Sequence, residues 1–268
     1  MIDNGMMFAF GLLLKIVMTV GIVVAASIVV ERSGPFVGSL MASLPTAGGA
    51  ALIIIAMEHP PAFVSQTAIG SIVSNVICTV FALAYAFLAQ RRSLAVSLGG
   101  AFLVWFVCAA LTRLVEWNIA TVVVLAVIVF PLTILAGKPL RAESPPKARV
   151  ALTGYDLAWR AGVVTLCVLV VTAASHSIGS FASGLLTFFP VAMGSYFVIL
   201  HPRIGGRATA SVAAHVQAPL IGLGLGLLAV HLLAETLGVW WAYAIGLSIG
   251  IGWNGLLWCV RQWRRRAV

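Results

Sequence analysis

Residues 34–45 read GPFVGSLMASLP, and residues 179–190 read GSFASGLLTFFP. The two stretches are 145 residues apart, and they share a glycine, a phenylalanine, a leucine and a proline at matched positions. At the same spacing, the cation Lys15 matches the cation Arg160. We interpret the two stretches as parts of two copies of one internal repeat.

The composition predicts that these repeats lie in a membrane. Apolar residues make up 62% of the 268 residues and charged residues only 9%, whereas a soluble domain carries about 25% charged residues. So few charges cannot cover the surface of a soluble domain. The composition therefore excludes soluble enzymes, disordered chains and secreted disulfide scaffolds, and it predicts an all-α polytopic membrane protein.

Nine stretches are long and apolar enough to form membrane-crossing helices, which need about 20 mostly apolar residues each. They are residues 7–30, 34–57, 62–89, 93–112, 118–137, 151–174, 179–200, 208–233 and 237–260. We expect a 4+1+4 arrangement. Residues 1–117 form the first four-helix repeat, residues 118–150 a connector helix and a basic cytoplasmic loop, and residues 151–268 the second repeat.

The number of crossings decides how the two repeats are oriented. A four-helix repeat and one connector together make an odd number of crossings, so we expect the second repeat to be inverted relative to the first. Inverted repeats occur in many secondary transporters, whose substrates bind near the midplane at the repeat interface.

The basic residues predict the orientation of the chain. With nine spans, one side of the membrane receives most of the sixteen Lys and Arg and the other side only Arg113. Because basic loops stay in the cytoplasm, we expect a bacterial inner-membrane protein with its N-terminus outside and its C-terminus inside. The net charge of +9 has the same origin, so we expect no nucleic-acid partner.

Lys15 and Arg160 are the first candidates for a substrate site. A charge at the centre of a span costs about 2.5–3.5 kcal/mol on insertion scales. We expect the two cations to approach each other across the two-fold axis and to bind a carboxylate or phosphate. In the alternative, structural interpretation, Asp156 neutralises Arg160 one helical turn away, while Lys15 has no such partner on its own helix.

Prolines and amides at matched positions complete the predicted site. Pro45, which precedes Thr46, and Pro190 each remove a helical hydrogen bond, so we expect two broken helices that offer backbone dipoles to an anion. Asn75 and Gln217 match at a spacing of 142 residues. We expect them to orient the substrate, and the alternative is that they only link helices.

The histidines suggest proton coupling rather than a metal site. His215 lies within a span and is the candidate proton carrier. It lies about 160° around the helix from His231, so the two do not share a face. We expect His59 and His176 at the membrane interface and Glu58 in solvent. We expect no metal, no other cofactor and, without motifs such as GxSxG or HExxH, no enzymatic activity.

The segments LLLKIV at 12–17 and GSLMASLPTAGG at 38–49 resemble the small bacterial inner-membrane proteins of the GlpM type. Those are single-repeat proteins with a similar early lysine and a similar G-L-x-P stretch. The chain looks like a fused, inverted pair of such units plus a connector helix, with Arg160 in place of the lysine in the second unit. The resemblance implies this topology and leaves the substrate open.

These features lead to one functional hypothesis and two alternatives. The first is a secondary transporter that binds a small anionic substrate at the midplane. The second is a flippase or binder for an anionic lipid such as a polyprenyl phosphate, which an apolar groove open to lipid would favour. The third is a non-transporting scaffold subunit, in which carboxylates pair with both cations. The expected partners are the anion or anionic lipid, the surrounding membrane lipids and, in a homo-oligomer, further copies of the chain.

Overall fold

The computed structural model describes residues 13, 15–22, 24–25, 46–141 and 153–266. These residues are helical apart from short turns, and no strand occurs among them. Seven helices or pairs of consecutive helices are long and apolar enough to cross a membrane. The protein is therefore an all-α, multi-pass membrane protein, as its composition predicts.

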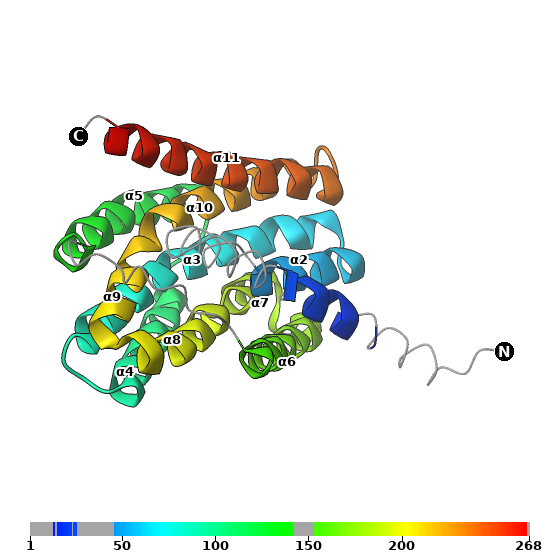
Figure 1. Ribbon diagram of the computed structural model, residues 1–268. Helices are drawn as coiled ribbons and strands as arrows, with labels where there is room; N and C mark the ends of the chain where they lie inside the picture. Colours follow the sequence, from blue (N-terminus) through cyan, green and yellow to red (C-terminus); the bar gives the residue numbers. More distant parts are fainter. Residues whose placement is uncertain (1–12, 14, 23, 26–45, 142–152, 267–268) are drawn as a thin grey trace.

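The described residues between 13 and 25 form a first helical segment (Figure 1). The helices that follow are α2 (Thr46–Glu58), α3 (Pro61–Ala89), α4 (Leu94–Leu111), α5 (Ile119–Ala136), α6 (Gly154–Ile178), α7 (Ser180–Thr187), α8 (Val191–Ile204), α9 (Gly206–His215), α10 (Gln217–Leu233) and α11 (Val239–Arg266). Two short 3-10 helices, Thr112–Leu114 and Pro139–Arg141, follow α4 and α5.

Seven of the predicted spans coincide with described helices to within a few residues at most ends. The other two, 7–30 and 34–57, lie partly outside the described residues, and α2 is the described part of the second. The total of nine spans, the division into domains and the two inverted repeats stay predictions.

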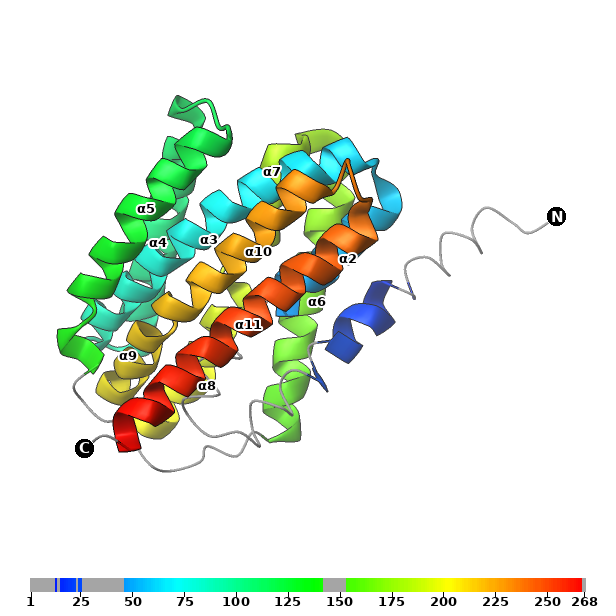
Figure 2. The ribbon, with the colours of Figure 1, turned by 90° about the horizontal axis from the view of Figure 1, so that it is seen from above.

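Helix α3 lies at the centre of the protein (Figure 2). It packs against α4, α5, α7, α9 and α10, and most of its side chains are buried. Glycines allow the closest of these contacts, because a Cβ on Gly70 of α3 or on Gly184 of α7 would collide with the backbone of the other helix. A collision with backbone leaves no room for a side chain at either position.

Helices α4, α5 and α11 form the periphery. Large apolar side chains on their outer faces are exposed, among them Leu103, Val127 and Trp241. In Figure 2, α11 lies along α10, and α4 and α5 lie on the opposite side of the molecule from α6. Since these exposed faces belong to helices of membrane-crossing length, we assign them to the lipid.

Two of the crossings are made by broken helices. The backbone leaves helical geometry between α7 and α8, where Pro190 is the residue before the first turn of α8, and this agrees with the predicted break. Pro45 lies outside the described residues, and Thr46 is the first described residue of α2, so the predicted break at Pro45 stays a prediction. The break between α9 and α10 at Val216 was not predicted from the sequence, although Pro219, which has no N–H, removes the hydrogen bond to the His215 carbonyl.

Candidate functional site

Helices α2 and α8 begin next to each other inside the protein. Gly48, in the first turn of α2, lies so close to the Phe188 ring that a Cβ would approach that ring to 2.6 Å. Phe188 precedes Pro190 at the break before α8, and Val191, the first residue of α8, packs in one apolar cluster with Ala51 of α2. We call this place, where Gly48 meets Phe188 and Val191, the half-helix junction.

The two helices run from the junction to opposite ends of the molecule. The last residue of α2, Glu58, lies beside His176 near the end of α6, whereas Arg203 of α8 is paired with Asp156 near the start of α6. We name these two ends the Glu58 end and the Arg203 end. Asp156 and His176 are separated by about 30 Å along α6, at about 1.5 Å per residue.

This geometry places the junction at mid-depth. Thr46 lies about 18 Å along α2 from Glu58, and Val191 lies about 18 Å along α8 from Arg203. Helix α8 is therefore too short to cross a hydrocarbon layer of about 30 Å, and it begins in the middle third of that layer. The first described turn of α2 lies at a similar depth. The sequence predicted this place from its prolines, but it did not predict that the two helices begin in contact.

Arg160 places a buried positive charge near the junction. Its side chain is 5% exposed, and the guanidinium carbon lies 5.2 Å from the centre of the Tyr196 ring on α8. Tyr196 follows the first residue of α8 by about 7.5 Å along the axis. The charge of Arg160 therefore lies close to the positive end of the α8 dipole.

Polar groups of α3 and α4 face the same region. Cys78 donates from Sγ to the Phe188 carbonyl over 3.2 Å, and Ser71 donates to the Gly184 carbonyl over 3.3 Å. Ser74 lies on the same face of α3 and next to the Cys78 thiol. The Ser74 hydroxyl and the Trp105 indole N–H are buried, and both interact with the Cys78 thiol. The three groups form a small polar cluster beside Phe188.

Lys15 has an interaction that the sequence did not predict. Its Nζ lies 2.5 Å from Oε1 of Glu58. Glu58 is exposed at the end of α2, as expected, but its carboxylate is held in an ion pair. The other carboxylate oxygen of Glu58 lies 3.6 Å from Nε2 of His176. Lys15 therefore belongs to the Glu58 end of the molecule.

The structure does not bring Lys15 and Arg160 together. Arg160 lies sixteen residues before His176 on α6, which is about 24 Å along the helix axis. Lys15 lies at the same end as His176, because both contact the carboxylate of Glu58. The expected approach of the two cations is wrong for a geometric reason. A two-fold axis in the membrane plane carries a residue above the midplane to the same depth below it, so only residues at the midplane meet.

The predicted partnership of Asp156 with Arg160 is replaced by another pair. Oδ2 of Asp156 accepts hydrogen bonds from the backbone and hydroxyl of Thr153, both at 2.7 Å, and lies 2.5 Å from Nη2 of Arg203. Asp156 thus caps the first turn of α6 and links it to α8.

Asn75 and Gln217 both connect helices, as the alternative interpretation of the sequence expects. Asn75 donates from Nδ2 to the Leu220 carbonyl of α10 over 2.9 Å, and Gln217 accepts from Nη2 of Arg141 over 3.1 Å. Each amide is buried, and Oδ1 of Asn75 and Nε2 of Gln217 have no partner in the described part of the chain. A role in substrate binding stays a prediction for both.

Arg141 is a residue that the sequence analysis missed. It was counted only as a loop charge, yet Nε donates to the Ala214 carbonyl over 3.0 Å and Nη2 to the Ile134 carbonyl over 3.2 Å. Arg141 thus links the 3-10 helix after α5 to the break between α9 and α10. Burial lowers the pKa of its guanidinium. Near this break, Nδ1 of His215 is hydrogen-bonded to the Ser211 carbonyl of its own helix at 2.7 Å. The proton-coupling role of His215 is untested.

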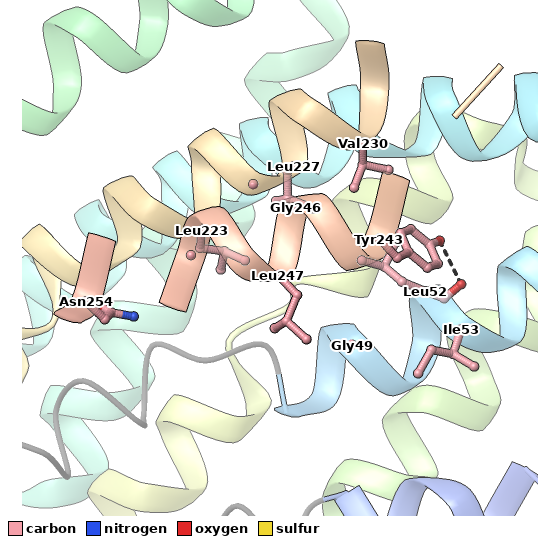
Figure 3. Close-up of a pocket in the computed structure, with 12 residues that line it drawn as sticks. Gly49, Leu52, Ile53, Leu223, Leu227, Val230, Tyr243, Gly246, Leu247 and Asn254 are labelled. Carbon is pink, nitrogen blue, oxygen red and sulfur yellow. Dashed lines mark hydrogen bonds between the residues drawn. The ribbon is translucent and has the colours of Figure 1, made fainter. Parts of the chain in front are cut away.

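A cavity of about 150 Å³ lies between α2, α10 and α11 (Figure 3). Its walls are glycines and aliphatic side chains, and it begins at Gly49, the residue after Gly48 of the junction. The Tyr243 hydroxyl donates to the Leu52 carbonyl at one end over 2.9 Å. At the other end, Oδ1 of Asn254 is buried without a partner among the described residues.

Comparison with known proteins adds no relative to this description. No family model, no curated protein and no solved structure matches the chain. Among the described residues, no group of three or more His, Cys, Asp or Glu side chains is arranged to hold a metal ion. The fold defines a multi-pass α-helical membrane protein, and the resemblance to GlpM-type proteins stays a prediction.

Proposed function

We propose that this protein is a secondary transporter that binds a small anionic substrate at the half-helix junction. The observation that carries the proposal is that the first described turn of α2 and the start of α8 are in contact at mid-depth, and that the two helices run to opposite ends of the molecule. The N-terminus of a helix carries about half a positive charge and presents free N–H groups. Two helix N-termini at one place would therefore favour the binding of an anion.

The groups around the junction also favour a negatively charged ligand. Pro190 makes no side-chain hydrogen bond to the first turn of α8, so the N–H groups of that turn have no side-chain cap. The buried cation Arg160 lies nearby on α6, and Ser74 offers a hydroxyl. A carboxylate or a phosphate bearing one or two negative charges fits such a set of donors.

The proposal assigns different roles to the residues predicted from the sequence. Arg160, the backbone that follows Pro45 and begins at Thr46, and the backbone that follows Pro190 bind the anion. Lys15 acts at a distance, through its pair with Glu58. Asn75 and Gln217 attach α10 to its neighbours and bind substrate only if α10 moves.

The ion pairs at the two ends support the inverted-repeat arrangement. Lys15 on the first helical segment pairs with Glu58 of α2, and Asp156 on α6 pairs with Arg203 of α8. Each pair links the outer end of a half-helix to a neighbouring helix, and the charges of Glu58 and Arg203 are opposite in sign. We propose that each pair closes one end and that alternating access opens them in turn.

We also propose that the protein lies in a bacterial inner membrane with the Glu58 end outside. The distribution of Lys and Arg supports this orientation, because Arg91, Arg92, Arg203 and Arg207 all lie on the other side. No enzymatic activity and no cofactor are part of the proposal.

The first experiment is a thermal-stability screen of the purified protein against organic anions, inorganic phosphate and lipid phosphates. Wild type, Arg160→Gln and the matched control Arg113→Gln are compared, because Arg113 is exposed in the turn after α4. We expect one class of anion to raise the melting temperature of wild type and Arg113→Gln but not of Arg160→Gln. Equal protection of all three proteins contradicts the proposed site. Uptake of the protecting anion into proteoliposomes then tests transport directly.

The cavity favours a second candidate function, a flippase or binder for an anionic lipid. Its walls are apolar and it begins beside the first turn of α2, so a headgroup at the junction would place a hydrocarbon chain near the cavity. The same screen separates the two functions. Protection by a lipid phosphate but not by inorganic phosphate, together with its loss in Leu247→Trp, favours the lipid. Leu247 lines the cavity, and Leu256→Trp on the same helix is the control, since Leu256 is exposed outside the cavity lining.

A further inference from the structure

Five side chains from three parts of the chain meet at the Glu58 end. Lys15 comes from the first helical segment, Glu58 and His59 from the end of α2 and the residue after it, and Ser175 and His176 from the end of α6. We call them the Glu58 cluster. The sequence analysis treated its two histidines as separate interfacial residues and did not expect them to meet.

The carboxylate of Glu58 has two basic neighbours. Oε1 lies 2.5 Å from Nζ of Lys15, and Oε2 lies 3.6 Å from Nε2 of His176. The first distance is that of a formed ion pair, and the second is longer than a hydrogen bond. The pair to His176 is therefore incomplete while the imidazole is neutral.

His59 is held in place by neutral contacts. Nε2 lies 2.8 Å from the hydroxyl oxygen of Ser175, and the ring stacks on Phe63 with centroids 3.9 Å apart. The rings of His59 and His176 are 4.6 Å apart. Burial and the neighbouring His176 lower the pKa of His59, and Glu58 opposes this effect.

A proton can reach this cluster from solution. The His176 side chain is 56% exposed, while those of Lys15 and Glu58 are about one quarter exposed. With both imidazoles neutral, Lys15 and Glu58 balance each other. Among the described residues, two further titratable side chains belong to elements packed near the start of α3: His231 of α10, whose Nδ1 is paired with Ser65, and Glu235, which follows Ala234 after α10.

We propose that the Glu58 cluster binds one proton, on His176, and that this proton releases the first helical segment from α2. Nε2 of His176 takes the proton from water and donates it in a hydrogen bond to Oε2 of Glu58. The carboxylate then shares its charge between two cations, and the pair with Lys15 weakens. A second proton on His59 is opposed by the charge 4.6 Å away, so one proton acts as the signal.

The inference rests on the proposed function in one respect, because it makes this proton the coupling ion of the transporter in place of one on His215. Helix α2 connects the two sites: Glu58 is its last residue, and its first turn is at the junction about 18 Å away. A short helix moves as one body, so a change at one end reaches the other. The proton from the outer solution thus opens the end through which the anion enters.

The test is a distance measurement between two spin labels by double electron–electron resonance spectroscopy, on the full chain in lipid nanodiscs at pH 8 and pH 5.5. Spin labels are placed at Val17→Cys and Phe87→Cys, both exposed in the native protein, with Cys78, Cys108, Cys167 and Cys259 replaced by alanine. We expect the distance distribution to shift or broaden on acidification. The fraction of molecules that change, plotted against pH, is expected to follow the titration of one proton. In the unprotonatable variant His176→Gln the pH 8 distribution is expected at both pH values.

Two further variants keep this test decisive. Lys15→Met is expected to show the acid distribution already at pH 8, because the pair with Glu58 is absent. His231→Gln, at the same end, is the control and is expected to respond as the parent does. An unchanged distribution in the parent, or a response that persists in His176→Gln, overturns the proposal. Since no anion is present, a failed ligand screen with an intact pH response would refute the transport function and leave the proton site standing.

Discussion

Helix α3 and the pair α9–α10, which the predicted repeat matches with each other, are attached to their neighbours in different ways. Helix α3 is one unbroken helix of 29 residues, and its buried Asn75 donates to a backbone carbonyl of α10. The pair α9–α10 is broken at Val216, and its buried Gln217 is bound by the cation Arg141. A continuous helix needs one side-chain contact to its neighbour, whereas a broken one needs a multivalent donor to satisfy its freed groups.

The Glu58 end and the Arg203 end of the molecule also differ. The Glu58 end combines its ion pair with two imidazoles that can take up a proton. At the Arg203 end, the carboxylate of Asp156 is fixed by Thr153 as well as by Arg203. We therefore expect the ion pair at the Arg203 end to stay formed and the ion pair at the Glu58 end to depend on pH. Four predictions test or refine this difference.

The largest effect is expected from Arg141→Met compared with Asn75→Ala. Removing the guanidinium leaves the Ala214 and Ile134 carbonyls and the Gln217 amide without a donor they have now. Unsatisfied buried groups cost about 1–3 kcal/mol each, so we expect a loss of about 3 kcal/mol. Asn75→Ala removes one hydrogen bond, and we expect about 1 kcal/mol. Reversible unfolding in mixed micelles measures both, and equal losses would show that the break in α9–α10 needs no special support.

Asp156→Ala is expected to have the next largest effect. Asp156 is nearly buried and Arg203 is partly buried. An exposed ion pair contributes about 0–1 kcal/mol to stability, and the removal of one partner from a buried pair costs about 3–5 kcal/mol. The cost of breaking this pair is expected between these limits. The variant also loses the capping interactions with Thr153. We expect a loss of about 2 kcal/mol in the same unfolding assay. Asp156→Asn is the control for the cap, because its amide oxygen still accepts from Thr153 while the charge is gone.

Lys15→Met is expected to cost less than Asp156→Ala. Lys15 and Glu58 are about one quarter exposed, so water screens their attraction, and we expect a loss of about 1 kcal/mol or less. Glu58→Gln is the partner variant, and the double variant should lose little more than either single one. A loss larger than that of Asp156→Ala would reverse the comparison between the two ends.

Much of the fold follows from local sequence. A span is a run of about 20 apolar residues, so the limits of α3 and α5 could be read closely without a structure. The break before α8 was also predictable, because Pro190 acts on its own helix. The break at Val216, which separates α9 from α10 inside the predicted span 208–233, was missed, although Pro219 is a signal for it.

The contacts of the site could not be predicted in the same way. Lys15 and Glu58 are on different helices, and Arg141 reaches a carbonyl 73 residues further along the chain. Such pairs depend on how helices pack, which hydrophobic periodicity does not determine. The predicted repeat matches Lys15 with Arg160, but the structure puts the two residues at opposite depths rather than at one place.

The smallest effect expected is a pH dependence confined to the Glu58 end. Burial, followed by the nearby His176, lowers the pKa of His59 in the folded protein below its ordinary value of 6.5, against the opposing effect of Glu58. Below about pH 6.5, the unfolded chain therefore binds more protons at this residue than the folded chain does, and the free energy of unfolding falls as the pH falls. The stability is complete above that range and declines from it toward pH 5. We expect His59→Gln to flatten this decline in a series of thermal melts, with His231→Gln as the control. A decline of the same size in His59→Gln would show that the group responsible for the loss of stability is not His59.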